Sequence, residues 1–304
     1  ILICVIFALS TLVLLSCSNK AIKSGDRSFT DDLGRQVFIP ENVIKVAPAG
    51  YIAQNYLIAA AKSSLCGLSV EVTNDQAQYF GKDLQSMQCY GQIYGGKGSL
   101  NKEALSSLNP ELIIDIGEAK QGAKEDIDNL QEQLKIPIVH IDSELSALDK
   151  SFERLGEALG SNSVSRCKEL AEYCKKTYEE TDKVLNTIPS EEKKNAIFLQ
   201  GPDALNVLAK GTFQAKAFDK LVNNLAVLDD ASSKGTGNDV SFEQIAKWNP
   251  EYIFLDQGTK PETISQDSRW QSIKAVQAGN IITVPKVPYG WLTTPPSFNQ
   301  LMGL

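Results

Sequence analysis

Histidine is nearly absent from this sequence, which contains one, His140, among 304 residues. Protein sites for bare zinc or manganese combine several nitrogen or sulfur ligands with carboxylates, so a single imidazole argues against a free transition-metal site. It also leaves only one residue of the type that most often acts as a general base. We interpret His140, which follows a short apolar run, as a structural residue at a strand end.

The sequence motifs of common catalytic sites are also missing. We find no Gly-x-Ser-x-Gly, no phosphate-binding loop ending in Gly-Lys-Ser/Thr and no Gly-x-Gly-x-x-Gly after a strand. The adjacent carboxylates of Asp31-Asp32 and Asp229-Asp230 lie in expected loops, and adjacency alone does not make two side chains converge. We therefore expect neither an enzyme nor a cofactor, with a secreted hydrolase as a distant alternative.

Concentrated positive charge is a third absence. The chain has 30 Lys and Arg against 37 Asp and Glu, a net charge of −7, and no dense basic cluster. Binding to nucleic-acid phosphates needs such a cluster, so a nucleic-acid partner is excluded. With 42% apolar and 22% charged residues, the chain has the material for one large or two medium globular domains.

Only one long apolar run occurs, at residues 1–15, and it is shorter than the about 20 residues that a membrane-spanning helix needs. The following Leu14-Leu15-Ser16-Cys17 resembles a bacterial lipobox, in which cleavage leaves a cysteine for lipid attachment. We expect a lipoprotein signal peptide at 1–17 and a polar tether at 18–28. The alternative is a simple membrane anchor; either places the rest outside the cytoplasmic membrane. We also expect residues to be missing at both ends.

Four cysteines remain after Cys17. A disulfide between Cys66 and Cys89 could form in an oxidising compartment, and this pairing is left open. Cys167 and Cys174 lie seven residues apart on an expected helix, about 10 Å along its axis, which is too far for a disulfide. Neither pair has the Cys-x-x-Cys spacing of a zinc site.

Short β-branched runs alternate with helical patterns, which is typical of βα units and parallel sheets. The expected strands are residues 43–47, 66–70, 112–116, 136–141, 196–200, 252–256 and 281–284. Residues 146–187 predict a helix, with a break at Gly160 left open and Pro189 beyond its end. The economical fold is α/β: two Rossmann-like lobes at 29–145 and 188–304, bridged by a single long α-helix, with the tail packing back toward lobe one.

An internal sequence repeat supports the prediction of two lobes. The segment from Glu103 to Ile114 aligns without a gap with the segment from Glu243 to Phe254, 140 residues later. Each predicts a short amphipathic helix that ends at Asn-Pro and leads into a buried strand. The Asn-Pro itself is interpreted as a convenient joint, whereas the two glutamates remain candidates for a role.

The sequence resembles class III solute-binding proteins of ATP-driven (ABC) importers, the family that binds ferric siderophores, haem and cobalamin. The resemblance covers residues 29–40, 108–114, 240–253 and 269–285, in the right order over roughly 250 residues. It implies an ABC permease, an ATPase and a rigid helix that permits only small hinge motion. It also implies a location on the outer face of the cytoplasmic membrane, as a lipid-anchored monomer.

In that family one acidic residue on each lobe meets basic residues of the permease. The matching residues are Glu103 and Glu243, the repeat-related pair, and two charges on equivalent surfaces would fix the orientation of docking. The alternative is that both are solvated glutamates near helix N-termini.

Ligands of α/β folds lie beyond the carboxyl ends of strands, which points to loops. Aromatic and amide side chains in glycine-containing loops suit a bulky ligand, and loop lysines suit an anion. The candidates are Gly50, Tyr51, Gln92, Tyr94, Lys97, Gln200, Asp203, Lys210, Thr212, Gln214, Gln257, Tyr289 and Trp291. We expect a metal chelate such as a ferric siderophore, haem or corrinoid, with molybdate or tungstate as the alternative. Axial ligation of a haem or corrin by His140 is left open.

Overall fold

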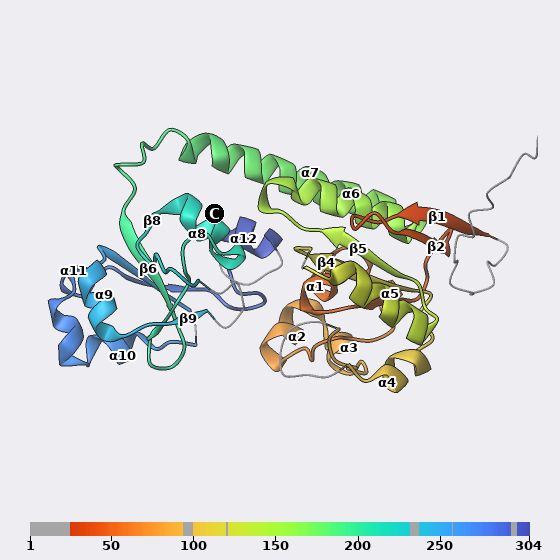
Figure 1. Ribbon diagram of the computed structural model, residues 1–304, viewed down its shortest axis with the longest axis horizontal. Helices are drawn as coiled ribbons and strands as arrows, with labels where there is room; N and C mark the ends of the chain where they lie inside the picture. Colours follow the sequence, from red (N-terminus) through yellow and green to blue (C-terminus); the bar gives the residue numbers. More distant parts are fainter. Residues whose placement is uncertain (1–24, 94–99, 120, 232–236, 257, 293–296) are drawn as a thin grey trace, which may run out of the picture.

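The computed structural model describes residues 25–93, 100–119, 121–231, 237–256, 258–292 and 297–304. It contains two α/β lobes that lie side by side beneath a long helix (Figure 1). Lobe one comprises the elements from β1 to α6, and lobe two those from β6 to β11. The two lobes have separate sheets, which agrees with the predicted fold class.

Lobe one begins with an antiparallel hairpin of β1 (Asp26–Thr30) and β2 (Gln36–Pro40). Its parallel sheet has the order β3 (Val46–Pro48), β4 (Leu112–Gly117) and β5 (Ile138–Asp142). The helices of this lobe, apart from α6, are α1 (Tyr51–Ala61), α2 (Asn74–Phe80), α3 (Lys82–Gln85), α4 (Lys102–Ser107) and α5 (Ala123–Leu134), with a 3-10 turn η1 (Lys62–Ser64).

The strand predicted at residues 66–70 does not form. This run makes only isolated bridges, from Leu65 to Val46 and from Leu68 to Cys89. The backbone N–H groups of Ser69 and Val70 donate to the side-chain Oε1 of Gln54, at 2.8 and 3.0 Å. A glutamine of α1 thus takes the place of a neighbouring strand, which residue pattern alone does not reveal.

The segment predicted as a connecting helix contains α6 (Leu148–Leu159) and α7 (Ser161–Leu185), preceded by the 3-10 turn η2 (Leu145–Ala147). Gly160 separates the helices with φ of +86°, and a Cβ there would lie 2.3 Å from the carbonyl oxygen of Glu41. A residue with a side chain is therefore excluded at this reversal. The helix α6 folds back along α7, and only α7 reaches lobe two (Figure 1).

Lobe two has a mixed sheet in the order β11 (Ile281–Val284), β10 (Tyr252–Asp256), β6 (Asn195–Gln200), β7 (Asn206–Val207) and β9 (Asn238–Asp239), and β8 (Asn223–Asn224) also pairs with β6. The strands β8 and β10 pair with β6 in parallel, and β11 pairs with β10 in parallel. The strand β7 is antiparallel to β6. The surrounding elements are η3 (Phe213–Ala215), α8 (Lys216–Leu221), α9 (Phe242–Trp248), α10 (Pro261–Ser265), η4 (Ser268–Ser272) and α11 (Lys274–Gln277).

The chain ends in α12 (Ser297–Gly303), which lies between the lobes beneath α7 (Figure 1). One hydrophobic core extends from lobe one into lobe two, a second core lies within lobe two, and a third lies within lobe one. Within the described ranges, no helix combines the length and apolar character needed to cross a membrane.

The two segments of the internal sequence repeat share the same local structure. Asn109 and Asn249 adopt positive φ, 50° and 44°, which asparagine tolerates better than most residues, and each ends a short helix before proline. The glutamate that follows the proline in each repeat accepts a hydrogen bond from a backbone N–H through its side chain. Glu111 accepts from the N–H of Ile44 at 2.8 Å, and Glu251 accepts from that of Asn195 at 3.0 Å. The Asn-Pro-Glu joint therefore fastens each helix-strand unit to the start of the neighbouring strand segment.

Candidate functional site

The carboxyl end of β3 in lobe one leads directly into α1. Gly50 precedes this helix and supplies no side-chain cap. The Oε1 of Gln92 takes that role by accepting a hydrogen bond from the N–H of Tyr51 at 2.9 Å, and it would lie 3.4 Å from a Cβ at Gly50. The structure thus brings Gly50, Tyr51 and Gln92 together, with the glutamine supporting the helix start.

Tyr289 reaches this part of lobe one from the loop that follows β11. Its ring packs against that of Phe80 at 5.1 Å between centroids, and Gln76 donates from Nε2 to the carbonyl oxygen of Pro288 at 3.0 Å. Burial raises the pKa of Tyr289 far above its ordinary value, and the nearby phenol of Tyr51 raises it further. Two phenols from opposite ends of the sequence therefore lie near each other.

The phenol of Tyr51 is also protonated at neutral pH. Burial raises its pKa, and the amide side chains of Asn55 and Gln76 oppose that rise without cancelling it. A protonated phenol is a hydrogen-bond donor as well as an acceptor. Tyr51 and Tyr289 thus offer donors and aromatic surface at the inner side of lobe one.

In lobe two, the carboxyl ends of β6 and β10 bring a second group of polar residues to one edge of the sheet. Gln200 ends β6, and exposed Asp203 follows in the next loop. Asp256 ends β10 and lies 3.5 Å from the Nζ of Lys286, which follows β11. Sequence reasoning missed Lys286, although its place directly after a predicted strand was a signal for it.

Lys210, Thr212 and Gln214 do not join this edge. The antiparallel strand β7 carries the chain back along β6, so that Lys210 contacts Asn223, 3.4 Å from Nζ to Oδ1, near the amino end of β6. The hydroxyl of Thr212 is buried and donates to the carbonyl oxygen of Ala209 at 2.8 Å. Sequence reasoning treated this loop as a continuation of the Gln200 region because the two-residue strand β7 gives no recognisable pattern.

The remaining candidates divide into two groups. Trp291 is half-buried, packs against the inner hydrophobic core and donates its backbone N–H to Pro285 at 3.0 Å. Tyr94, Lys97, Gln257 and the lipidation residue Cys17 lie outside the described residues.

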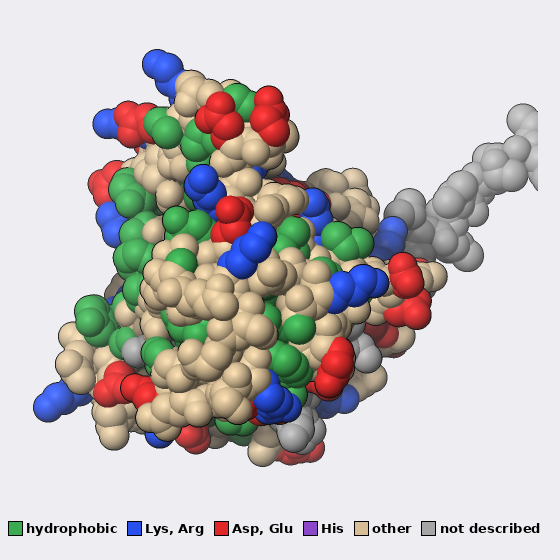
Figure 2. Space-filling model, turned by 90° about the vertical axis from the view of Figure 1, so that its left-hand side faces the viewer, with side chains coloured by type: hydrophobic (Ala, Val, Ile, Leu, Met, Phe, Trp, Pro, Cys, Tyr) green, Lys and Arg blue, Asp and Glu red, His purple; other side chains and the backbone are tan. Residues whose placement is uncertain are grey.

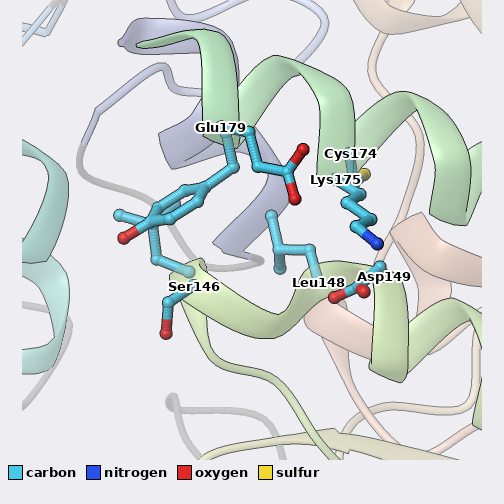
Figure 3. A pocket seen from close by; sticks show the side chains of 8 residues that line it. Ser146, Leu148, Asp149, Cys174, Lys175 and Glu179 are labelled. Carbon is cyan, nitrogen blue, oxygen red and sulfur yellow. The ribbon is translucent and has the colours of Figure 1, made fainter. Parts of the chain in front are cut away.

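A small cavity of about 90 Å³ lies elsewhere, where η2 and the start of α6 meet α7 (Figure 3). Polar and charged side chains, including Asp149, Lys175 and Glu179, line it. None of the predicted ligand residues contributes to its wall, so this cavity is separate from the candidate site.

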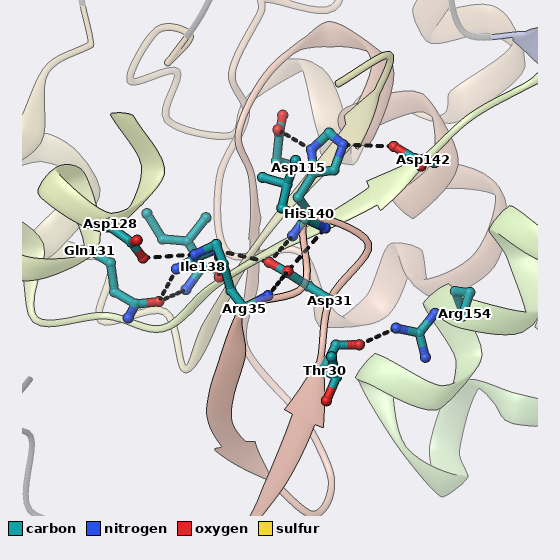
Figure 4. A network of polar contacts seen from close by, with 11 residues as sticks. Thr30, Asp31, Arg35, Asp115, Asp128, Gln131, Ile138, His140, Asp142 and Arg154 are labelled. Atoms are coloured by element: carbon teal, nitrogen blue, oxygen red, sulfur yellow. Dashed lines mark hydrogen bonds and ion pairs between the residues drawn. The ribbon is translucent and has the colours of Figure 1, made fainter. Parts of the chain in front are cut away.

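His140 is held in a polar network of lobe one (Figure 4). Its Nδ1 lies 2.7 Å from Asp115 and its Nε2 3.1 Å from Asp142. Burial lowers the pKa of His140, but the two carboxylates outweigh that effect and raise it overall. Because both ring nitrogens have carboxylate partners, neither is free to ligate a haem or corrin. Among the described residues no cluster of possible metal ligands occurs.

The four described cysteines are free thiols. Cys66 donates to the carbonyl oxygen of Val46 at 3.4 Å, and burial raises the pKa of its thiol to about 11. Cys167 and Cys174 are buried on α7, as the sequence predicts.

A sequence model described as a periplasmic binding protein matches residues 64–288, which is most of the chain. The chain belongs to this family. Its members are binding components of transport systems, in agreement with the prediction that the protein is not an enzyme. A curated relative from Bacillus subtilis, an uncharacterized ABC transporter substrate-binding lipoprotein, is 22% identical over 70% of this chain. The alignment spans 64% of the length of that relative.

Solved structures of periplasmic binding proteins share the fold. An ABC transporter solute-binding protein from Sulfurospirillum deleyianum has a TM-score of 0.82 at 22% identity, with 91% of this chain and 86% of the other covered. A Haemophilus influenzae protein bound to molybdate has a TM-score of 0.68 at 18% identity, with 91% and 90% covered. A vitamin B12-binding protein of Vibrio cholerae has a TM-score of 0.63 at 18% identity, with 87% and 94% covered. At these identities the likeness shows the fold alone.

In this periplasmic binding protein, Glu103 and Glu243 occupy equivalent exposed positions in the first turns of α4 and α9. The backbone N–H of Glu243 and the hydroxyl of Ser241 hydrogen-bond to the Glu243 carboxylate, and with the charge of Arg269 they lower its pKa. Side chains of both charge signs are interspersed with hydrophobic ones on the lobe-two end of the molecule (Figure 2).

Proposed function

We propose that this protein is the extracytoplasmic solute-binding component of an ABC importer, which takes up its solute between the lobes and delivers it to the permease. The observation that carries this proposal is that the loop after β11 of lobe two packs on lobe one near Tyr51, where the ring of Tyr289 contacts Phe80 and the carbonyl oxygen of Pro288 accepts a hydrogen bond from Gln76. Family membership supplies the transport context. No catalytic group is needed for this function.

We further propose that the solute is a metal chelate such as a ferric siderophore, haem or corrinoid. Two protonated phenols, the ring of Phe80 and the amide of Gln76 offer aromatic area and hydrogen bonds, which suit a bulky ligand with acceptor oxygens. The vitamin B12-binding neighbour supports a ligand of this size.

Molybdate or tungstate is the second candidate, because a molybdate-bound protein shares the fold. The described residues favour it less. Lys210 lies near the amino end of β6, and Lys286 has Asp256 beside it, which offsets its charge. A small dianion would therefore find little uncompensated positive charge among the candidates that the structure describes.

Isothermal titration calorimetry with haem, cobalamin, ferric siderophores, molybdate and tungstate tests this assignment. We expect heat of binding with one chelate class, and a rise in Tm with the same class in a thermal-unfolding assay. The affinity should fall at least tenfold in Tyr289→Ala and by less in Tyr289→Phe. Lys210→Ala is the matched control and should bind normally. Binding of oxyanions alone would overturn the chelate assignment while leaving the transport function intact.

We propose that Glu103 and Glu243 dock the permease and that a lipid on Cys17 holds the protein at the outer face of the cytoplasmic membrane. Reversal of both charges, Glu103→Lys with Glu243→Lys, should abolish uptake by cells while solute affinity stays unchanged. Glu125→Lys, at an exposed position of α5, is the control. Normal uptake by the double variant would remove the docking role.

The lipid anchor is tested separately with the variant Cys17→Ala. Release of this variant into the soluble fraction would support the anchor.

A further inference from the structure

The helix α12 contacts both lobes. The ring of Phe298 packs against Tyr56 at 5.0 Å and Phe152 at 6.1 Å between centroids, and both partners belong to lobe one. Two residues later, the Nε2 of Gln300 donates to the carbonyl oxygens of Phe213 and Gln214, at 3.1 and 3.0 Å, in lobe two. One short helix thus has an apolar anchor in one lobe and a polar anchor in the other.

The chain that leads to α12 adds to the first anchor. Tyr289 contacts Phe80 of α2 on one side and Phe298 on the other, the latter at 5.5 Å with the rings nearly perpendicular. Edge-to-face packing of this kind adds to the stability gained from burial alone. A continuous row of rings results, which comprises Phe80, Tyr289, Phe298, Tyr56 and Phe152.

The inner hydrophobic core joins the lobes at the same place. Leu301 of α12, 2% exposed, belongs to the same core as Tyr56 of lobe one and Phe218 of lobe two. Separating the lobes would expose this apolar surface, which has a free-energy cost in proportion to its area.

The long helix α7 is attached unevenly by comparison. Its buried residues, Ser163, Cys167, Ala171 and Cys174, all lie in its first part, which packs on lobe one. Near its other end the ion pair of Asp182 with Lys220 and the stacking of Lys220 on Tyr178 are partly exposed. Partly exposed ion pairs contribute little to stability.

From this contrast we propose that α12 acts as a wedge that sets the angle between the lobes, and that its packing limits separation of the lobes more than the attachment of α7 to lobe two does. The wedge comprises Phe298, Gln300 and Leu301. Opening then requires Gln300 to leave lobe two or Phe298 to leave the aromatic row. The proposal concerns motion of the lobes and holds whatever the solute.

Double electron–electron resonance on the full chain tests the wedge. Spin labels on unnatural amino acids at Lys82 and Glu262, exposed on lobe one and lobe two, report the distance between the lobes. We expect Phe298→Ala to shift the distance distribution to longer values and to widen it. Gln300→Leu, which leaves the aromatic row intact, should do the same to a smaller extent and serves if Phe298→Ala folds poorly.

Two control variants make the result decisive. Phe242→Ala removes a ring that packs on Trp270 inside lobe two, so it should lower stability without changing the distance. Lys220→Met removes the ion pair between lobe two and Asp182 of α7 and should also leave the distance unchanged. The wedge is wrong if Phe298→Ala and Gln300→Leu both keep the wild-type distribution, or if Lys220→Met alone opens the lobes.

Discussion

Each lobe contains one Asn-Pro-Glu joint, but the two lobes are stabilised internally by different buried polar groups. Lobe one buries an ion pair, Arg35 with Asp31 at 3.0 Å, whose side chains are 3% and 0% exposed. Lobe two has no matching pair among its described residues and instead buries amide and aromatic side chains, such as Asn224 and Trp270. The lobes should therefore respond differently to charge removal and to pH.

The buried pair of lobe one is fully satisfied, which explains why it is tolerated (Figure 4). The guanidinium of Arg35 also donates to Asp128 at 2.7 Å, to the carbonyl oxygen of Ile138 at 2.9 Å and to Gln131 at 3.1 Å. Since removal of one partner leaves the other charge buried, the pair is a point at which lobe one is vulnerable.

The largest effect is expected for Arg35→Met, which leaves the carboxylate of Asp31 buried without its cation. We expect a loss of about 3–5 kcal/mol in the free energy of unfolding, measured by urea denaturation. The double variant Asp31→Asn with Arg35→Met should recover part of that loss. Equal losses in the single and double variants would show that packing, rather than the unpaired charge, is responsible.

A smaller loss is expected when a buried amide of lobe two is removed. Asn224 donates from Nδ2 to Asp219 at 2.8 Å and to Leu208 at 3.1 Å, and it accepts from the N–H of Ala226 at 3.0 Å. Asn224→Leu leaves these partners unsatisfied and should cost about 1–3 kcal/mol in the same denaturation experiment. If this variant loses more than Arg35→Met, the contrast between the lobes is wrong.

The smallest effect concerns pH. The pKa of His140 is higher in the folded protein than its ordinary value, so its stabilising contribution is fully present below about pH 6.5 and is lost as pH rises through the folded pKa. We expect wild-type stability to fall over this interval and His140→Gln to lack that fall. Thermal unfolding between pH 5.5 and 8.5 measures the difference, and parallel curves for the two proteins would exclude a titrating His140.

Local sequence patterns predicted much of the framework. The strands at 112–116, 196–200, 252–256 and 281–284 coincide closely with β4, β6, β10 and β11, because buried parallel strands are short apolar runs between helices. The candidate site was predicted less completely. Gly50, Tyr51 and Tyr289 lie together, but Lys210 and Thr212 do not join them, since the reversal at β7 depends on pairing that two residues cannot signal.

Sequence reasoning also undervalued the carboxylates of the first hairpin. Asp31 and Asp32 were set aside as neighbours in a loop, yet Asp31 pairs with Arg35 and Asp32 with Arg154. Arg35 lies four positions after Asp31, whereas Arg154 lies 122 positions after Asp32 in the chain. A carboxylate's role at such a distance has no local signature.

The sequence by itself determined the alternation of strands and helices and the repeated Asn-Pro-Glu joints, because each depends on backbone preferences within a few residues. It left a break at Gly160 open, and the structure decided that α6 folds back along α7 there. Only the tertiary structure decided that Tyr289 lies beside Tyr51 and that Phe298 packs into lobe one. These contacts join residues more than 200 positions apart, and the free energy that selects them comes from burying side chains of both lobes against the same tail.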